Sequence, residues 1–363
     1  MKCGIIGLPN VGKSTLFNSL LKKRVALSAN YPFATIEPNT GIVPVPDHRL
    51  LELAELTKDE EKMNTLPPIV PAVIEFVDIA GLVKGASTGA GLGNQFLSHI
   101  REVDAIIHVM RDFEDENIVR EGSTEPKSDR EIIETELALA DLQTVEKLIA
   151  GQDKQARITK DTLDNQKLEI LKQIYKELSE GIKLGKYNIG DERVRDWFFK
   201  LPLLTIKPVL YVFNVDEGSY AHRLEHENAN TNELVISARL EEELVELDDT
   251  ERVEYLKELG ILETGLERLI KKAYWLLGLC SFLTAGKKEV RAWTIKEGTK
   301  APQAAGVIHT DFEKGFIRAQ VIEYSKLIEA QTMVEAKKRG WVRTEGKEYI
   351  VKDGDVVEFL IGS

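Results

Sequence analysis

Hydrophobic residues along this chain gather in short apolar runs that are separated by longer amphipathic or polar segments. Five of the runs have the length and composition of buried strands, at residues 3–6, 73–77, 104–110, 207–213 and 234–236. The segment Thr15–Leu21, which comes soon after the first run, reads as a helix. Strands that alternate with helices predict an α/β domain with a mostly parallel sheet.

A long insertion separates the third of these strands from the fourth, and its pattern is helical. Glu131–Ile149 and Leu163–Leu178 carry apolar residues at intervals of three and four. Gly151 and its neighbours are expected to form the bend between them, so the pair predicts an antiparallel, coiled-coil-like arm. Asp191–Phe199 is expected to return as a third helix. Such an arm is either a docking surface or a cap over the domain that carries the sheet.

The pattern changes again from Phe282 onward, where short strands predict a small α+β domain. Strands are expected at Val290–Ile295, Glu348–Val351 and 356–360, with a helix near Ile317–Ala330. The predicted boundaries are residues 1–120 with 200–278 for the sheet domain, 121–199 for the arm and 279–363 for the C-terminal domain.

Charge and cysteine content narrow the class of protein. A formal charge of −12 argues against a DNA-binding or general nucleic-acid-binding protein. Residues 280–363 hold 14 Lys and Arg against 12 Asp and Glu, so this part is the better candidate for contact with a polyanion.

Cys3 and Cys280 form neither a disulfide framework nor a metal spacing, and we expect both to be buried thiols. The apolar stretch Ala273–Ala285 is too short to span a membrane, so we expect a cytoplasmic protein without a membrane partner.

The segment from Gly7 to Ser14 matches the phosphate-binding P-loop, G-x-x-x-x-G-K-S/T. It lies between a predicted strand and a predicted helix, which is the setting that the motif requires. Lys13 can bridge the terminal phosphates of a nucleotide, and the Ser14 hydroxyl can bind Mg²⁺. Backbone N–H groups at the start of the helix surround the phosphates. The residues expected to bind the nucleotide here are Asn10, Val11, Gly12, Lys13, Ser14 and Thr15.

Two further segments are expected to respond to the γ-phosphate. Thr35 lies in a proline-containing loop, where a threonine can complete the Mg²⁺ shell. Asp78 and Gly81 form a D-x-x-G motif at the end of a predicted strand, so Asp78 can hold a water of the metal and the Gly81 N–H can bond the γ-phosphate. Leu82 follows directly, at the place where Ras-like enzymes carry a water-orienting glutamine. Either another group performs the hydrolysis, or turnover is slow until a partner arrives.

The base of the nucleotide is expected to meet two late segments. Asn214, Val215 and Glu217 stand where GTP-binding proteins carry N-K-x-D, and Ser237 with Ala238 stands where they carry S-A-K. Glutamate is longer than the aspartate that accepts the guanine N1–H and 2-amino group, and valine supplies no aliphatic lysine stem to cover the base. Guanine specificity is therefore in doubt, and adenine becomes plausible.

These motifs together resemble the YchF/Obg-like ATPases, a branch of the Obg-related, translation-factor class of P-loop proteins. The resemblance covers essentially the whole chain. It is carried by residues 7–14, 30–39, 78–86, 214–217 and 352–355. Residues 301–306 and 309–316 resemble the family's TGS domain, a ubiquitin-like β-grasp module.

The resemblance implies more than the motifs do by themselves. It implies an ATPase that prefers ATP to GTP, that has an apolar residue in place of the glutamine, and that acts on ribosomes or ribosomal RNA. Several relatives depend on K⁺ held partly by a P-loop asparagine, which corresponds to Asn10. Some members carry a catalytic histidine in the loop after the fourth strand. The matching loop here, residues 116–122, contains no histidine, so that role is not transferred.

We therefore expect a monomeric, slow, Mg²⁺-dependent ATPase switch in which Lys13, Gly81 and Leu82 surround the reacting phosphate and Ser14, Thr35 and Asp78 hold the metal. A GTPase with relaxed base specificity is one alternative. A nucleotide-gated ribosome- or RNA-binding protein with incidental turnover is another. A P-loop metabolite kinase fits poorly, because such kinases lack the late Asn-x-x-Glu and Ser-Ala pair.

Overall fold

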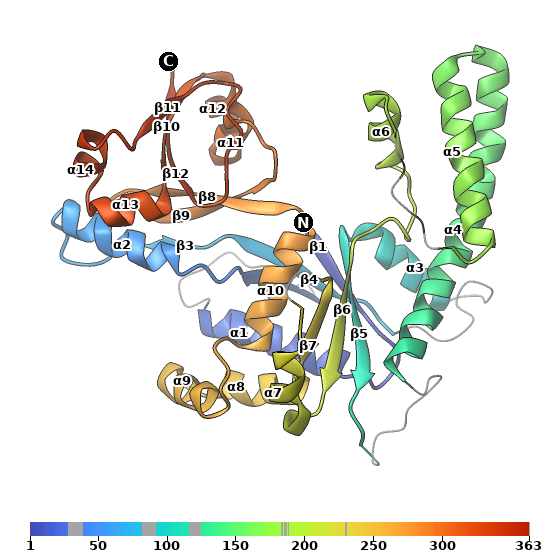
Figure 1. The fold of residues 1–363 in the computed structure, drawn as a ribbon, viewed down its shortest axis with the longest axis horizontal. Coiled ribbons are helices and arrows are strands. Elements are labelled where there is room, and N and C mark those ends of the chain that lie inside the picture. Colours follow the sequence, from blue (N-terminus) through green and yellow to red (C-terminus); the bar gives the residue numbers. More distant parts are fainter. Residues whose placement is uncertain are drawn as a thin grey trace. The chain divides into compact units, whose positions relative to one another are not determined.

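A computed structural model of the chain describes residues 1–27, 39–81, 92–115, 125–182, 184, 187, 189–228 and 231–362. These residues divide into two compact units (Figure 1). Unit 1 comprises Met1–Lys22, Thr35–Gly41 and Phe76–Gly265, and unit 2 comprises Lys23–Ala34, Ile42–Glu75 and Leu266–Ser363. The three-part boundaries expected from the sequence remain a prediction.

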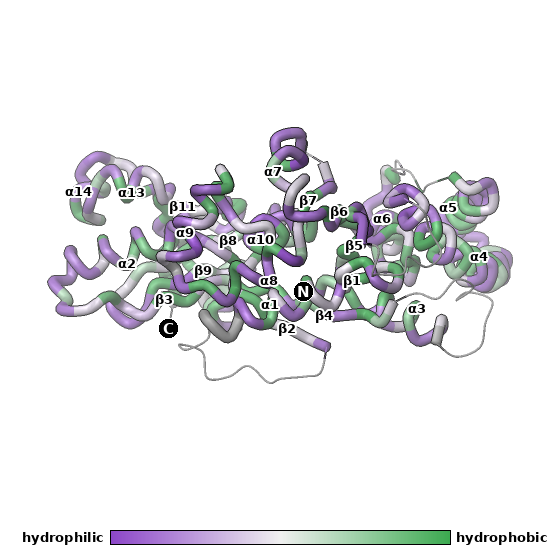
Figure 2. Tube along the Cα trace, turned by 90° about the horizontal axis from the view of Figure 1, so that it is seen from below, coloured by the Kyte–Doolittle hydropathy of each residue, from purple (hydrophilic) through white to green (hydrophobic). Residues whose placement is uncertain are grey.

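The first sheet has six strands in the order β2-β4-β1-β5-β6-β7. These are β1 (Lys2–Ile6), β2 (Thr40–Pro44), β4 (Val73–Asp78), β5 (Ala105–Asp112), β6 (Val209–Val215) and β7 (Glu233–Ile236). The pairs β1–β5, β5–β6 and β6–β7 are parallel, so the predicted α/β class is confirmed. All five predicted strands are present. Figure 2 shows hydrophobic stretches along β1 and β5, whose residues are almost all buried.

Sequence order and sheet order together locate the ligand-binding edge. Strand β1 has β4 on one side and β5 on the other, so the connections diverge at its carboxyl end. Open α/β sheets bind ligands at such a switch point. Helix α1 (Lys13–Leu27) begins there, after the loop that follows β1. Five other helices follow outside the arm in unit 1 or at its border, α3 (Leu92–Glu102), α7 (Glu217–Glu225), α8 (Ala238–Glu246), α9 (Asp249–Glu258) and α10 (Gly265–Leu276).

The predicted helical arm is present, but its bend lies elsewhere. Helix α4 (Pro126–Thr159) runs straight through Gly151, so the predicted bend at that glycine is wrong. The chain reverses at Lys160, which has a left-handed φ of 51°, and α5 (Thr162–Ser179) follows. One interior glycine costs a helix only about 1 kcal/mol, which the packing of a long helix pair outweighs. The third helix, α6 (Glu192–Phe198), is confirmed, with Asp191 as its N-cap.

Apolar side chains from the three arm helices share one core. It contains Val145, Leu171, Ile174, Leu178, Phe198, Leu201 and Leu203. At the root of the arm, the buried carboxylate of Asp141 on α4 accepts hydrogen bonds from Leu204 N at 2.9 Å and from Thr205 N at 2.8 Å. The Thr205 hydroxyl donates to the same carboxylate at 2.7 Å. The arm is therefore fastened to the segment that leads into β6.

The second sheet lies in unit 2 and has the order β11-β10-β12-β8-β9-β3. Its strands are β3 (Ile69–Val70), β8 (Leu279–Ala285), β9 (Val290–Lys296), β10 (Phe316–Glu323), β11 (Arg343–Glu345) and β12 (Asp355–Ile361). Its helices are α2 (Arg49–Glu60), α11 (Ala301–Ile308), α12 (Thr310–Lys314), α13 (Tyr324–Ala330) and α14 (Met333–Lys338). The core includes Phe282, Ile295, Phe316 and Val357, and the predicted α+β class is confirmed.

Two local predictions in this unit are wrong. The helix expected near Ile317–Ala330 is a strand over Phe316–Glu323 and a helix only from Tyr324. The first half becomes β10 because it pairs along its length with β12, where Val321 faces Val357, and tertiary pairing overrides local propensity. The strand expected at Glu348–Val351 is reduced to a single bridge between Lys300 and Ile350.

No helix among the described residues combines the length and apolar content that crossing a membrane requires. Cys3 and Cys280 are buried and unpaired, as predicted. Burial raises the pKa of the Cys280 thiol to about 11, which keeps it protonated near neutral pH.

Candidate functional site

The P-loop connects the end of β1 to the start of α1. Two of its residues have positive φ values, which residues other than glycine rarely adopt. Asn10 and Gly12 have φ values of 63° and 89°. A Cβ added at Gly12 would overlap Nδ2 of Asn214, and one added at Gly7 would lie 2.7 Å from the carbonyl oxygen of Val109. Both glycines are therefore required by close approach of neighbouring groups. The backbone N–H groups of such a loop and of the helix start that follows it are where a phosphate would bind.

Lys13 and Asp78 meet at this edge of the sheet. Nζ of Lys13 donates to Oδ1 of Asp78, and the two side chains are only 11% and 18% exposed. Asp78 ends β4, and its own N–H donates to the carbonyl oxygen of Asn39 at 2.8 Å. Ser14 is exposed one residue further along α1. The structure thus brings together an ammonium group, a carboxylate and a hydroxyl that were predicted to share one site.

The neighbouring switch residues are only partly described. Gly81 is exposed, and a Cβ added there would lie 3.3 Å from the carbonyl oxygen of Gly7. The loop after β4 therefore begins beside the P-loop. Thr35 and Leu82, which were also predicted to belong to the site, lie outside the described residues.

Asn214 joins the P-loop to the segments predicted to bind the base. Its side-chain Nδ2 donates to the carbonyl oxygen of Val11 at 2.9 Å, and its Oδ1 accepts from Ala238 N at 2.9 Å. The side chain is buried, so both hydrogen bonds are shielded from water. Through this one amide, residues far apart in the sequence are held at one place.

The other predicted base-binding residues differ in burial, and therefore in whether their side chains can contact a ligand. Val215 is buried in a cluster with Tyr220 and Leu240. Ser237 is buried as the N-cap of α8, where its hydroxyl accepts from Leu240 N at 3.4 Å. Glu217 is half-buried at the first position of α7, so its carboxylate is the group with access to a ligand.

Tyr255 is a neighbour of the site that sequence reasoning missed. Its phenol donates to Oε1 of Glu217 at 3.1 Å, which raises the pKa of Tyr255 because the protonated phenol is stabilised. Tyr255 lies on α9, 38 residues after Glu217. No local motif marks it, so only the tertiary structure reveals the contact.

His108 is a core histidine. It lies in the middle of β5, fully buried beside the ring of Tyr211. Burial lowers its pKa to about 3, so the imidazole is neutral at physiological pH. Its Nε2 has no hydrogen-bond partner among the described residues.

The donor set fits Mg²⁺ better than a transition metal. No group of three or more His, Cys, Asp or Glu side chains that could hold a metal occurs among the described residues. Ser14 and Asp78 instead supply hard oxygen atoms at one edge of the sheet. Mg²⁺ keeps several waters and is usually bound by one or two protein oxygens together with substrate phosphates. The residues present therefore fit Mg²⁺ that arrives with a nucleotide.

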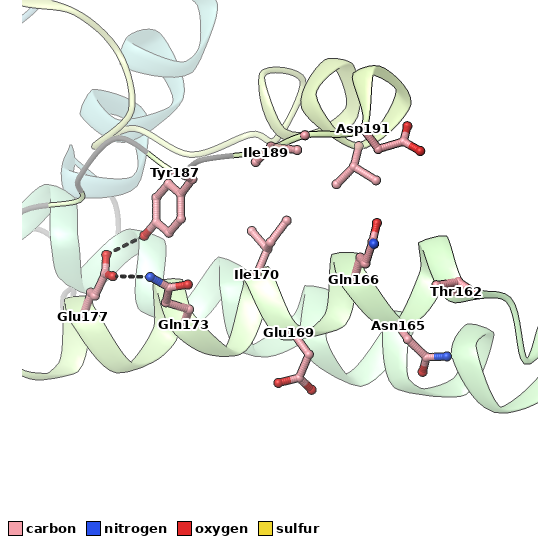
Figure 3. A pocket seen from close by; sticks show the side chains of 12 residues that line it. Thr162, Asn165, Gln166, Glu169, Ile170, Gln173, Glu177, Tyr187, Ile189 and Asp191 are labelled. Atoms are coloured by element: carbon pink, nitrogen blue, oxygen red, sulfur yellow. Dashed lines mark hydrogen bonds between the residues drawn. The ribbon is translucent and has the colours of Figure 1, made fainter.

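A separate groove of about 610 Å³ lies on the arm, between α5 and residues 189–194 (Figure 3). At one end Tyr187 donates to Oε2 of Glu177 at 2.5 Å, and Nε2 of Gln173 donates to Oε1 at 2.8 Å. None of the predicted nucleotide-binding residues lines it. The groove is therefore distinct from the P-loop site.

Two family models match segments of this chain. Residues 2–147 match the family model described as 50S ribosome-binding GTPase. Residues 279–362 match the YchF-GTPase C-terminal model, described as protein of unknown function (DUF933).

Full-length relatives are similar throughout. A Bacillus subtilis (strain 168) protein named ribosome-binding ATPase YchF is 49% identical, over 99% of this chain and 98% of its own length. A protein of the same name from Escherichia coli O157:H7 is also 49% identical over the same shares. The structure of the Schizosaccharomyces pombe YchF GTPase is similar with a TM-score of 0.85 at 38% identity, and the match covers 99% of this chain and 97% of that one.

Proposed function

Since this chain belongs to the YchF family of P-loop nucleotide hydrolases, we propose that it is a slow, Mg²⁺-dependent ATPase that acts on ribosomes. The observation that carries the preference for ATP is the half-buried carboxylate of Glu217 at the start of α7. Its arm is one methylene longer than that of the aspartate that reads guanine. The neighbouring Val215 is buried and cannot cover a base as a lysine stem would. Both features weaken guanine recognition.

Electrostatics would supply most of the catalysis. The ammonium of Lys13, which contacts Asp78, would stabilise charge on the transferring phosphoryl group. The Gly81 N–H would bond the γ-phosphate, and Leu82 supplies no group that orients water. A site without a positioned base is expected to turn over slowly.

Ser14, Asp78 and Thr35 would hold Mg²⁺, with Asp78 acting through a bound water. The metal neutralises charge on the β- and γ-phosphates when it is bound. Asn10, in its left-handed conformation in the P-loop, is our candidate for a residue that helps to hold K⁺.

The ribosome role rests on the relatives that are named ribosome-binding ATPases. The arm and the C-terminal domain are the proposed contact surfaces, and the nucleotide would control their docking. Co-sedimentation with ribosomes in the presence of ADP, ATP and a non-hydrolysable ATP analogue tests this role. Equal binding in all three states would contradict a nucleotide-controlled switch.

Titration calorimetry with ATP and GTP, in K⁺ and then in Na⁺ buffer, tests the proposed substrate. Clear preference for ATP is expected. Equal or tighter binding of GTP would favour the alternative, a GTPase with relaxed specificity.

The catalytic role of the P-loop lysine is tested separately. Lys13→Ala should lower the rate of ATP hydrolysis by about 10²-fold or more, because it removes charge stabilisation at the reacting phosphate. Intact hydrolysis in this variant would overturn the site.

A further inference from the structure

The hydrogen bond from Tyr255 to Glu217 makes the two carboxylate oxygens of Glu217 differ in their hydrogen bonding. Oε1 accepts from the phenol at 3.1 Å. Among the described residues, no hydrogen bond to Oε2 of Glu217 is present. If the carboxylate faces the base, Oε2 is therefore the oxygen with its acceptor capacity unused.

Guanine and adenine make different demands on such a carboxylate. Guanine presents two adjacent donors, N1–H and the 2-amino group, and a carboxylate satisfies them best with both oxygens at once. Adenine presents a single donor, its 6-amino group, beside the acceptor N1. A phenol that donates to one oxygen uses part of its acceptor capacity and fixes the orientation of the carboxylate, so the two-oxygen contact with guanine is weakened while the other oxygen still receives the adenine donor.

We propose that Tyr255 determines base specificity by engaging Oε1 of Glu217 and so leaving Oε2 as the better acceptor for the base. Tyr255 is a positioning residue, because it acts through Glu217 and not by touching the nucleotide. The inference rests on the proposed function, since it requires Glu217 to face the base of ATP.

The position of the phenol is set by the packing of α9 and not by the hydrogen bond alone. The Tyr255 ring packs against a cluster in which Val215, Tyr220, Leu240 and Leu256 are buried. These residues come from β6, α7, α8 and α9, and Figure 1 shows the three helices at the same end of the sheet. Asp248 and Glu251 close the start of α9 with a capping box. Removal of the hydroxyl alone should therefore leave the ring in place.

The test is Tyr255→Phe, with the affinities of ATP, GTP and ITP measured by titration calorimetry. The freed Oε1 should strengthen GTP binding, so that the ratio of ATP to GTP affinity falls about tenfold, the value of one charge-assisted hydrogen bond. ITP lacks the 2-amino donor and should gain less than GTP. Tyr187→Phe is the matched control, because it removes the same hydroxyl from a tyrosine–glutamate pair on the arm (Figure 3).

The outcomes separate this inference from the proposed function. A wild-type protein without preference for ATP overturns the proposed function. A wild type that prefers ATP, together with an unchanged ratio in Tyr255→Phe, overturns only the role of Tyr255. An equal loss of ATP and GTP affinity would show a merely structural role and would also overturn it. Glu217→Gln provides the second variant, and unchanged affinities for both nucleotides in that protein would show that Glu217 does not face the base.

Discussion

The side-chain amide of Asn214 donates to the carbonyl oxygen of Val11 at 2.9 Å, which ties the P-loop to the end of β6 across 203 residues of sequence. The same amide accepts from Ala238 N, so one buried group holds three segments. The geometry of the phosphate-binding loop therefore depends on a residue that a nucleotide-binding motif would assign to the base.

Substitution of this amide should disturb both stability and binding. Asn214→Ala leaves a buried carbonyl oxygen and a buried N–H without partners. We therefore expect the free energy of unfolding to fall by about 2–4 kcal/mol and ATP binding to weaken. Urea denaturation and calorimetry measure the two effects. Asn165→Ala is the control, because its amide donates to Asp161 at an exposed site on the arm and its loss should cost less than about 1 kcal/mol. Equal effects of the two variants would contradict the bridging role.

Gly12 should tolerate no side chain, for two reasons that a matched variant separates. Gly12 and Gly298 have similar positive φ values, 89° and 84°, so alanine at either position should cost about 1–2 kcal/mol in backbone strain. Only at Gly12 does the new Cβ also meet Asn214, whereas nothing lies within 4 Å at Gly298. Gly12→Ala should therefore abolish ATP binding while Gly298→Ala retains it. Retained ATP affinity in Gly12→Ala would be incompatible with the observed packing.

His108 should make the protein less stable as the pH falls. Its folded pKa of about 3 lies below the ordinary value of 6.5, so the unfolded chain binds the proton more readily between these limits. The stabilisation is complete above about pH 6.5 and is lost as the pH falls toward 3. Between pH 7 and pH 5 the loss should be about 2 kcal/mol.

Chemical denaturation at both pH values measures this effect. His108→Gln and His108→Phe remove the titrating group, so each should lose about 2 kcal/mol less than the wild type over the same pH interval. A wild-type pH dependence that persists in both variants would show that His108 is not its source.

Helix α4 should become more stable when its interior glycine is replaced. A Cβ at Gly151 meets nothing within 4 Å, so Gly151→Ala should raise the free energy of unfolding by about 1 kcal/mol. Gly181 is equally open, but its φ of 69° makes alanine unfavourable there, and Gly181→Ala should have the opposite sign. Thermal denaturation of the two variants provides the comparison, and destabilisation by Gly151→Ala would refute the continuous helix.

Local sequence patterns predicted the parts of this protein whose structure is decided locally. The P-loop has its strand, glycine turns and helix within residues 2–27, and all three were expected. The predictions failed where distant segments decide the outcome. Phe316–Glu323 is a strand because β12 pairs with it, and Gly151 lies within a helix because an antiparallel partner supports it.

The same distinction applies to the candidate site. Lys13 and Asp78 could be paired in advance because two known motifs place them at adjacent strand ends. Tyr255 could not be found, because the contact with Glu217 depends on how α9 folds back over α7 and α8. A hydrogen bond between residues that belong to no motif has no signature in a single sequence.

Because α4 extends well beyond Asp141, a small movement at the contact of Asp141 with Leu204 and Thr205 would be larger at the end of the helix. A helix of 34 residues is about 50 Å long, at about 1.5 Å per residue. Asp141 holds the segment that leads into β6, and β6 carries Asn214 as its last residue but one. Asp141 lies 18 residues, about 27 Å, before the far end of the helix at Thr159, so a tilt of only about 5° at that contact would move the far end by roughly 2 Å, by the same helix geometry. The arm is therefore a lever that would turn a displacement too small to break a hydrogen bond into one that a partner could detect.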